Sequence, residues 1–96
     1  MTYEEVMKAP VVLMEFYATW CPHCRQMAPV MDQIRELLEG QAPVVQVDID
    51  KERQLADDFE VEATPTFLIF KDGEVAWRHS GEMDGNLLLS KVQSYL

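Results

Sequence analysis

Basic residues are scarce in this sequence. Eight lysines and arginines stand against 17 aspartates and glutamates, which gives a formal net charge of −9. A surface with that excess of negative charge repels phosphate backbones and anionic lipid headgroups. We therefore exclude nucleic acids and membrane surfaces as partners and interpret the acidity as a source of solubility.

Long apolar runs are also absent, and the longest apolar stretches have the length of single strands. Residues 1–10 contain two glutamates and no apolar segment typical of a secretory signal. If Met1 is the true start, we expect a cytoplasmic protein; a leader that has already been removed is the alternative. With 96 residues, 48% of them apolar, we expect a single domain over residues 1–96 with its own core.

Cysteine is limited to two residues, Cys21 and Cys24. Two thiols cannot build a disulfide framework or a four-thiolate zinc site within one chain. In a reducing compartment, so closely spaced a pair is more typical of transient redox chemistry than of a structural bridge. The sequence thus predicts neither a bound cofactor nor a resident metal.

The two cysteines lie where an apolar strand is followed by an amphipathic helix. Residues 11–17 form a short, β-branched and aromatic run that predicts a buried strand. From position 21 or 22 to Glu39, apolar residues recur at spacings of three and four, which predicts a helix with Gly40 at its C′ position.

A helix N-terminus favours an ionised thiol. Unpaired N–H groups and the positive end of the helix dipole lie there, and both stabilise a thiolate. We therefore predict that Cys21 is the exposed nucleophile, with a pKa below that of a free thiol. Cys24, one turn into the helix, is predicted to be more buried and to act as the resolving thiol. Residues at positions i and i+3 share one helical face, so the two sulfurs can close a small disulfide ring.

The rest of the chain alternates between helical and strand patterns. We expect helices over residues 2–8, 51–59 and 85–96, and strands over residues 44–49, 66–71 and 74–79. Thr2, Asp50 and Asp84 are placed to cap the three helices, and Asp72-Gly73 predicts a two-residue hairpin turn. This order predicts a mixed sheet in which the first two strands are parallel, the last two are antiparallel, and helices cover both faces.

A series of motifs extends over the chain from Val11 to Leu96: Glu15-Phe16-Tyr17-Ala18-x-Trp20-Cys21-x-x-Cys24, Ala28-Pro29, Val47-Asp48-x-Asp50, Thr64-Pro65-Thr66, Phe70-Lys71-Asp72-Gly73 and Gly81. These motifs give the chain a resemblance to the thioredoxin family. It implies an α/β thioredoxin-like fold, with a mixed central sheet of four or five strands and helices on both faces. It also implies a thiol–disulfide oxidoreductase that acts on protein disulfides, with a separate reductase or oxidant as its redox partner.

Three departures from the family pattern stand out. Only ten residues precede Val11, so we expect the family's first strand to be absent and residues 44–49 to form an exposed edge. Between the cysteines lies Pro22-His23, which resembles the dipeptide of the periplasmic disulfide-forming oxidase rather than the Gly-Pro of ordinary thioredoxins. Glu15 replaces the buried aspartate behind the second cysteine.

Two of these positions carry chemical hypotheses. A buried Glu15 would have a raised pKa and could pass a proton to or from Cys24; the alternative is a glutamate at the strand edge that reaches solvent. An imidazolium at His23 would stabilise the Cys21 thiolate and make the couple more oxidising; the alternative is a solvated histidine without effect.

The resemblance also implies a substrate surface. Pro65 is expected after a cis peptide bond that faces the sulfurs, and the backbone of Thr64 is expected to pair with an extended substrate. Trp20, Pro22 and Gly81 are expected to complete a shallow contact surface.

Together these features predict a cytoplasmic protein-disulfide reductase with a relatively oxidising potential. The alternatives are a disulfide-forming oxidase or isomerase, a dimer that shares a metal or iron–sulfur cluster through paired Cys21 and Cys24, and an interaction module without turnover.

Overall fold

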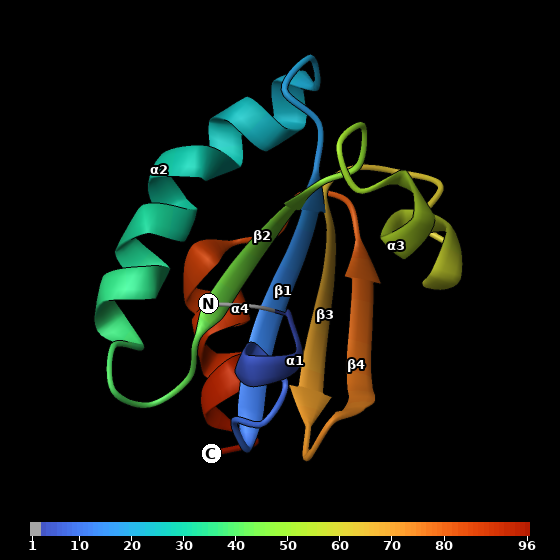
Figure 1. Cartoon of the computed structure of the whole chain (residues 1–96). Coiled ribbons are helices and arrows are strands. Elements are labelled where there is room, and N and C mark those ends of the chain that lie inside the picture. The colour runs from blue at the N-terminus through green and yellow to red at the C-terminus, as the bar shows by residue number, and fades with distance from the viewer. Residues whose placement is uncertain (1–2) are drawn as a thin grey trace.

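The computed structural model describes residues 3–96, which fold around a mixed sheet (Figure 1). The elements are α1 (Tyr3–Val6), β1 (Val11–Tyr17), α2 (Pro22–Leu37), β2 (Val44–Asp48), α3 (Arg53–Asp58), β3 (Thr66–Lys71), β4 (Glu74–Ser80) and α4 (Gly85–Gln93). The sheet order is β2-β1-β3-β4; β1 is parallel to β2 and antiparallel to β3, which is antiparallel to β4. The predicted mixed sheet is therefore confirmed, with four strands in the described residues.

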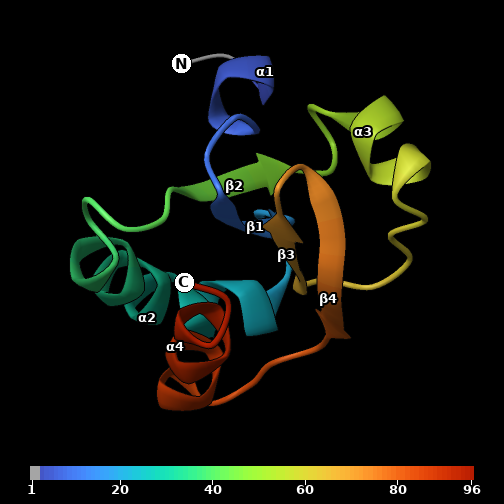
Figure 2. The ribbon, with the colours of Figure 1, turned by 90° about the horizontal axis from the view of Figure 1, so that it is seen from below.

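Helices cover both faces of this sheet, as predicted. Seen from below, α2 and α4 lie on one side and α1 and α3 on the other (Figure 2). Alternate residues of β1 face the two layers: Leu13 packs with side chains of α2 and α4, and Met14 packs with Val6 of α1 and Ala56 of α3. Because both of its faces are buried, β1 is apolar at nearly every position, and Glu15 is the exception.

β2 lies at one edge of the sheet, which confirms the predicted edge strand. Its first three residues are half-buried, whereas β1 and β3 are buried along almost their whole length. None of the helices formed by residues 3–96 has the length and apolarity needed to cross a membrane.

All four predicted helices end earlier in the structure than expected: the third ends one residue early, at Asp58, and the last ends at Gln93 instead of Leu96. The first was predicted over residues 2–8 but spans Tyr3–Val6, and its predicted cap, Thr2, lies outside the described residues. The second was predicted to reach Glu39 but ends at Leu37, because the chain tightens and the Leu38 N–H reaches the carbonyls of both Ile34 and Glu36. Gly40 therefore lies beyond C′, although its positive φ of 79° suits a glycine.

The third helix differs more, because its predicted cap has another partner. α3 begins at Arg53 instead of Lys51, and its N-cap Glu52 makes no side-chain capping bond. The turn before α3 is held by Asp48, whose carbonyl accepts from Glu52 N–H at 2.8 Å and whose carboxylate accepts from Asp50 N–H at 2.9 Å. The carboxylate of Asp50 points instead toward Trp20.

The hairpin and the start of the last helix agree with the sequence pattern. Asp72 and Gly73 have φ values of 51° and 85°, which are typical of the tight turn predicted between β3 and β4. β4 is one residue longer than the predicted 74–79 strand. Asp84 caps α4 as predicted, because its carboxylate accepts the N–H groups of Asn86 and Leu87.

Candidate active site

Cys21 is the N-cap of α2. Its backbone is extended (φ −85°, ψ 117°), and Pro22 is the first helical residue, where its lack of an N–H costs nothing. The N–H of Cys24 donates to the Cys21 sulfur at 3.4 Å. The sulfur thus takes the place of a capping oxygen at the positive end of the helix dipole, which confirms the predicted location.

The predicted exposure of Cys21 is wrong. Both thiols are free and both are buried, with 4% of Cys21 and 5% of Cys24 exposed. They pack together with Ala18, and Tyr17 and Ile49 close over this small cluster. A substrate must therefore approach a recessed sulfur, and the two thiols differ in their electrostatics more than in their exposure.

The two sulfurs have opposite pKa shifts. Burial alone would raise the pKa of Cys21, but hydrogen bonds with Thr64, with Cys24 and with the backbone of His23 outweigh it and lower the pKa. For Cys24, burial raises the pKa to about 11, and the neighbouring Cys21 adds to the increase. Near neutral pH the pair therefore holds one readily ionised thiol beside one that stays protonated.

The loop before β3 faces these sulfurs. The Thr64–Pro65 peptide bond is cis, as the family resemblance implied, and the Thr64 carbonyl oxygen lies 3.5 Å from the Cys21 sulfur. The Gly81 N–H donates to the Pro65 carbonyl at 2.7 Å, which brings the end of β4 to the same place. Gly81 has a φ of 101°, a conformation that disfavours any side chain.

Trp20 and Pro22 precede and follow Cys21 in the chain, and both side chains are exposed. Trp20 is 61% exposed, and its Nε1–H donates to the Asp50 carboxylate at 2.9 Å. Arg25 donates to the Trp20 carbonyl at 3.4 Å, so the exposed residue is held from two sides. Asp50 was predicted to cap a helix, and its place in the Val47-Asp48-x-Asp50 motif was the available signal of this second role.

His23 pairs with Glu82 across the site. Its Nδ1 contacts a Glu82 carboxylate oxygen, and the histidine side chain is largely exposed. The hydrogen bond and the charge of Glu82 raise the pKa of His23, and the nearby Cys21 contributes a smaller increase. Glu82 was not singled out from the sequence, where its place directly after Gly81 was the available signal.

Glu15 is buried under α2, with 2% of its surface exposed, so the alternative of a solvent-reaching glutamate is wrong. Burial raises the pKa of Glu15 more than a hydrogen bond from Gln46 and the charge of Arg35 lower it. Gln46 donates to the Glu15 carboxylate at 2.9 Å and accepts from Arg35 at 2.6 Å. Gln46, rather than Cys24, is thus the side chain bonded to this carboxylate, and proton exchange with Cys24 stays a prediction. Gln46 lies directly opposite Glu15 in the strand register, which the sequence alone did not specify.

Within residues 3–96 no group of three or more histidine, cysteine, aspartate or glutamate side chains is arranged to hold a metal ion. What the structure brings together is a dithiol at a helix N-terminus, a cis-proline loop facing it, a glycine beside that loop, and an imidazole–carboxylate pair at the rim. This arrangement suits exchange of electrons between thiols and disulfides.

Comparison with known proteins agrees with this chemistry. The family model described as Thioredoxin matches residues 2–94. Thioredoxin 1 of Nostoc is 42% identical over 94 residues, covering 97% of this chain and 88% of the relative. Thioredoxin Y2, chloroplastic, of Arabidopsis thaliana is 39% identical over 85 residues; the match covers 88% of this chain and 51% of that protein, so the chain spans about half its length.

Solved structures show the same fold. A mutant thioredoxin from Halobacterium salinarum superposes with a TM-score of 0.86 at 34% identity, covering 95% of this chain and 80% of the other. Thioredoxin of Fasciola hepatica superposes with a TM-score of 0.85 at 27% identity, covering 96% and 86%. On the family match, on these relatives and on its own dithiol geometry, this chain belongs to the thioredoxin family.

Proposed function

We propose that this chain is a thiol–disulfide oxidoreductase that acts on protein disulfides through Cys21 and Cys24. The observation that carries the proposal is the place of the Cys21 sulfur: it caps α2, 3.4 Å from the Cys24 backbone nitrogen and 3.5 Å from the Thr64 carbonyl oxygen. The Cys24 N–H and the positive end of the helix dipole stabilise a thiolate there, and the Thr64 carbonyl marks the loop beside it that can hold a substrate.

Reduction of a substrate takes two exchange steps. The Cys21 thiolate attacks one sulfur of the substrate disulfide, so that a mixed disulfide forms and the other substrate sulfur leaves as a thiolate. Cys24 then loses its proton and attacks the Cys21 sulfur, which releases the second substrate sulfur and closes the Cys21–Cys24 disulfide. Two electrons pass from the chain to the substrate, and a separate reductase returns them.

Glu15 is the proposed acceptor of the Cys24 proton. Its raised pKa makes the Glu15 carboxylate a stronger base, and a base is needed there because burial raises the pKa of the Cys24 thiol to about 11. Trp20, Pro22, Thr64, Pro65 and Gly81 are proposed to form the surface on which an extended segment of the substrate lies.

We further propose that the protein works in the cytoplasm as a reductase with a relatively oxidising potential. His23 supports this, since its pairing with Glu82 favours the imidazolium near the thiolate, and a stabilised thiolate means a stabilised reduced form. Equilibration with glutathione measures the potential: a value near about −270 mV favours a reductase and one near about −120 mV an oxidase. A His23→Pro variant should be more reducing and should reduce insulin faster; an unchanged potential would remove His23 from the account.

The test of the central step is titration of the reduced protein, followed by thiolate absorbance in the ultraviolet. We expect one thiol to ionise below the ordinary cysteine pKa and the second only at a pKa of about 11. A Cys24→Ser variant assigns the first ionisation to Cys21. If Cys21 ionises no more readily than free cysteine, the proposed exchange mechanism is wrong.

A further inference from the structure

The edge strand β2 lies in a groove that the proposed redox chemistry does not use. Two hollows flank the strand, one of about 820 Å³ toward α2 and one of about 360 Å³ toward α3. Val6 of α1 lines both hollows, and between them they are lined by every residue of β2. We call these two hollows together the β2 groove.

The backbone of β2 presents hydrogen-bonding groups to this groove. Leu13 N–H donates to the Pro43 carbonyl and Ile49 N–H donates to the Tyr17 carbonyl, so the odd-numbered residues of β2 pair with β1. In a parallel ladder the residues between them point the other way, which turns the backbone of Val44, Gln46 and Asp48 outward.

Two of these outward backbone groups, the carbonyls of Val44 and Asp48, already accept hydrogen bonds, whereas those of Gln46 between them have no backbone partner among residues 3–96. Arg35 donates to the Val44 carbonyl at 3.4 Å, and the N–H of Glu52 donates to the Asp48 carbonyl at 2.8 Å. Among residues 3–96, the N–H and C=O of Gln46 have no backbone partner. The centre of the edge thus has the donor and acceptor that an added strand pairs with.

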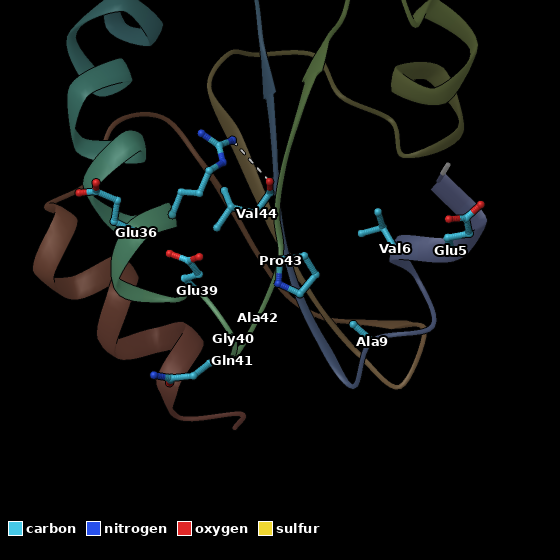
Figure 3. Close-up of a pocket in the computed structure, with 11 residues that line it drawn as sticks. Glu5, Val6, Ala9, Glu36, Glu39, Gly40, Gln41, Ala42, Pro43 and Val44 are labelled. Carbon is cyan, nitrogen blue, oxygen red and sulfur yellow. Dashed lines mark hydrogen bonds between the residues drawn. The ribbon is translucent and has the colours of Figure 1, made fainter. Parts of the chain in front are cut away.

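The two walls of the groove differ in character. Toward α2, the exposed carboxylates of Glu36 and Glu39 line the larger hollow (Figure 3), and Arg35 lines it too and donates to the Val44 carbonyl of β2. The charge of Arg35 is offset by Asp32 at 3.5 Å, and its side chain also binds Gln46. This wall therefore carries a surplus of negative charge.

The opposite wall combines apolar and charged side chains. Val6 lies across β2 from the acidic wall (Figure 3), and Val45, Val47 and Leu55 line the same side of the groove toward α1 and α3. Glu5, Lys51 and Glu52 line this side as well, next to these apolar side chains. Side chains of an added strand would point alternately to the two walls. The matching pattern is therefore one of alternating apolar and basic residues.

From this geometry we propose that the β2 groove binds an extended, basic segment of a partner protein as a fifth strand, with its apolar side chains on the Val6 wall and its basic side chains near Glu36 and Glu39. A second copy of this chain fits less well, because each copy carries a net charge of −9 and pairing of two β2 edges would bring like-charged walls together. This docking site is independent of the cysteines.

The probe is a blocked heptapeptide of alternating lysine and valine, titrated into the ¹⁵N-labelled reduced protein. We expect shifts concentrated on β2 and slowed hydrogen exchange of the Gln46 N–H, with affinity that falls as salt rises. A peptide of the same composition in two blocks, and one with glutamate in place of lysine, should bind at least about tenfold more weakly.

Variants separate the two recognition elements. Val44→Pro removes an outward N–H while leaving the β1 ladder intact, because proline is tolerated where an edge N–H faces away from its neighbour strand. It should reduce binding to the level of the block peptide. The double change Glu36→Gln and Glu39→Gln should weaken binding about fivefold, whereas Asp72→Asn with Glu74→Gln, at the hairpin between β3 and β4, should leave it unchanged.

The outcomes are decisive in either direction. Equal binding of the alternating and block peptides would overturn the proposal, since it would mean charge attraction alone. A Gln46 N–H that is already protected from exchange without peptide would also overturn the proposal, because the chain itself would then occupy the edge. A dimer in sedimentation that Val44→Pro dissociates would overturn it as well, because a second copy would then occupy the edge. A Cys21→Ser variant should bind the peptide unchanged, so failure of the redox mechanism and failure of this site are distinguishable.

Discussion

Replacing Glu15 by glutamine should make the protein more stable near neutral pH. Glu15 is 2% exposed and accepts a hydrogen bond from the neutral amide of Gln46, so an ionised carboxylate there is poorly compensated for the water it has lost. Glutamine keeps the shape and still accepts from Gln46. We expect a gain of about 1–2 kcal/mol in the free energy of unfolding at pH 7, which for a domain of this size raises Tm by roughly 5–15 °C.

The sign of the pH dependence follows from the raised pKa. Between the ordinary value of 4.5 and the higher value in the folded protein, Glu15 binds more protons when folded than when unfolded. Its contribution to stability is therefore full below pH 4.5 and is lost as the pH rises through the folded pKa. The difference in unfolding free energy between Glu15→Gln and the unmodified protein should thus be near zero at acid pH and grow above it.

The assay is urea denaturation of both reduced proteins from about pH 4 to about pH 8, a range that spans the expected titration, followed by circular dichroism. Glu36→Gln is the matched control, because Glu36 is exposed and the same charge change there should stay within about 0.5 kcal/mol at every pH. If the Glu15→Gln difference is flat across pH, the carboxyl is not titrating in the buried state and the reasoning is refuted. As a kinetic readout, the same variant should resolve mixed disulfides more slowly if Glu15 accepts the Cys24 proton.

Three further changes test the surroundings of the thiols and the fold that carries them. Glu82→Gln should lower the pKa of His23 toward its ordinary 6.5, seen by NMR titration of the ring, and Glu62→Gln, an exposed change of the same kind, should leave it in place. Gly81→Ala should cost about 1–3 kcal/mol in the free energy of unfolding, because φ is 101° and, apart from the adjacent residues, no atom of residues 3–96 lies within 4 Å of the added Cβ, so the strain is in the backbone. Thermal melting measures it, and an unchanged Tm would contradict it. Asp84→Ala should lower Tm by roughly 4–8 °C through loss of the α4 cap, and a loss below about 1 °C would show that water replaces it.

The order of elements was predictable because local patterns encode it. Apolar runs, spacings of three and four, and turn residues such as Asp72-Gly73 fall where the structure has strands, helices and the hairpin. Helix ends were predicted less well. Asp50 has the side chain of a capping residue, yet in the fold Trp20 offers it a hydrogen bond 30 positions away.

The sequence by itself determined the place of the dithiol. A strand, a tight turn and a helix that starts at Cys21 are local features, and they put a sulfur at a helix N-terminus whatever the rest of the chain does. It also indicated that residues 44–49 would form an edge strand, and β2 lies at an edge of the sheet formed by residues 3–96.

Only the tertiary structure decided how the sulfurs and the carboxylates are surrounded. The hydrogen bond between Glu15 and Gln46 joins residues 31 positions apart, and the pairing of His23 with Glu82 joins residues 59 positions apart. The 4% exposure of Cys21 depends on the packing of the segments around it. Charges and thiols take their pKa values from neighbours in space and from loss of water. Those quantities exist only once the sheet register and the helix packing have brought distant segments together.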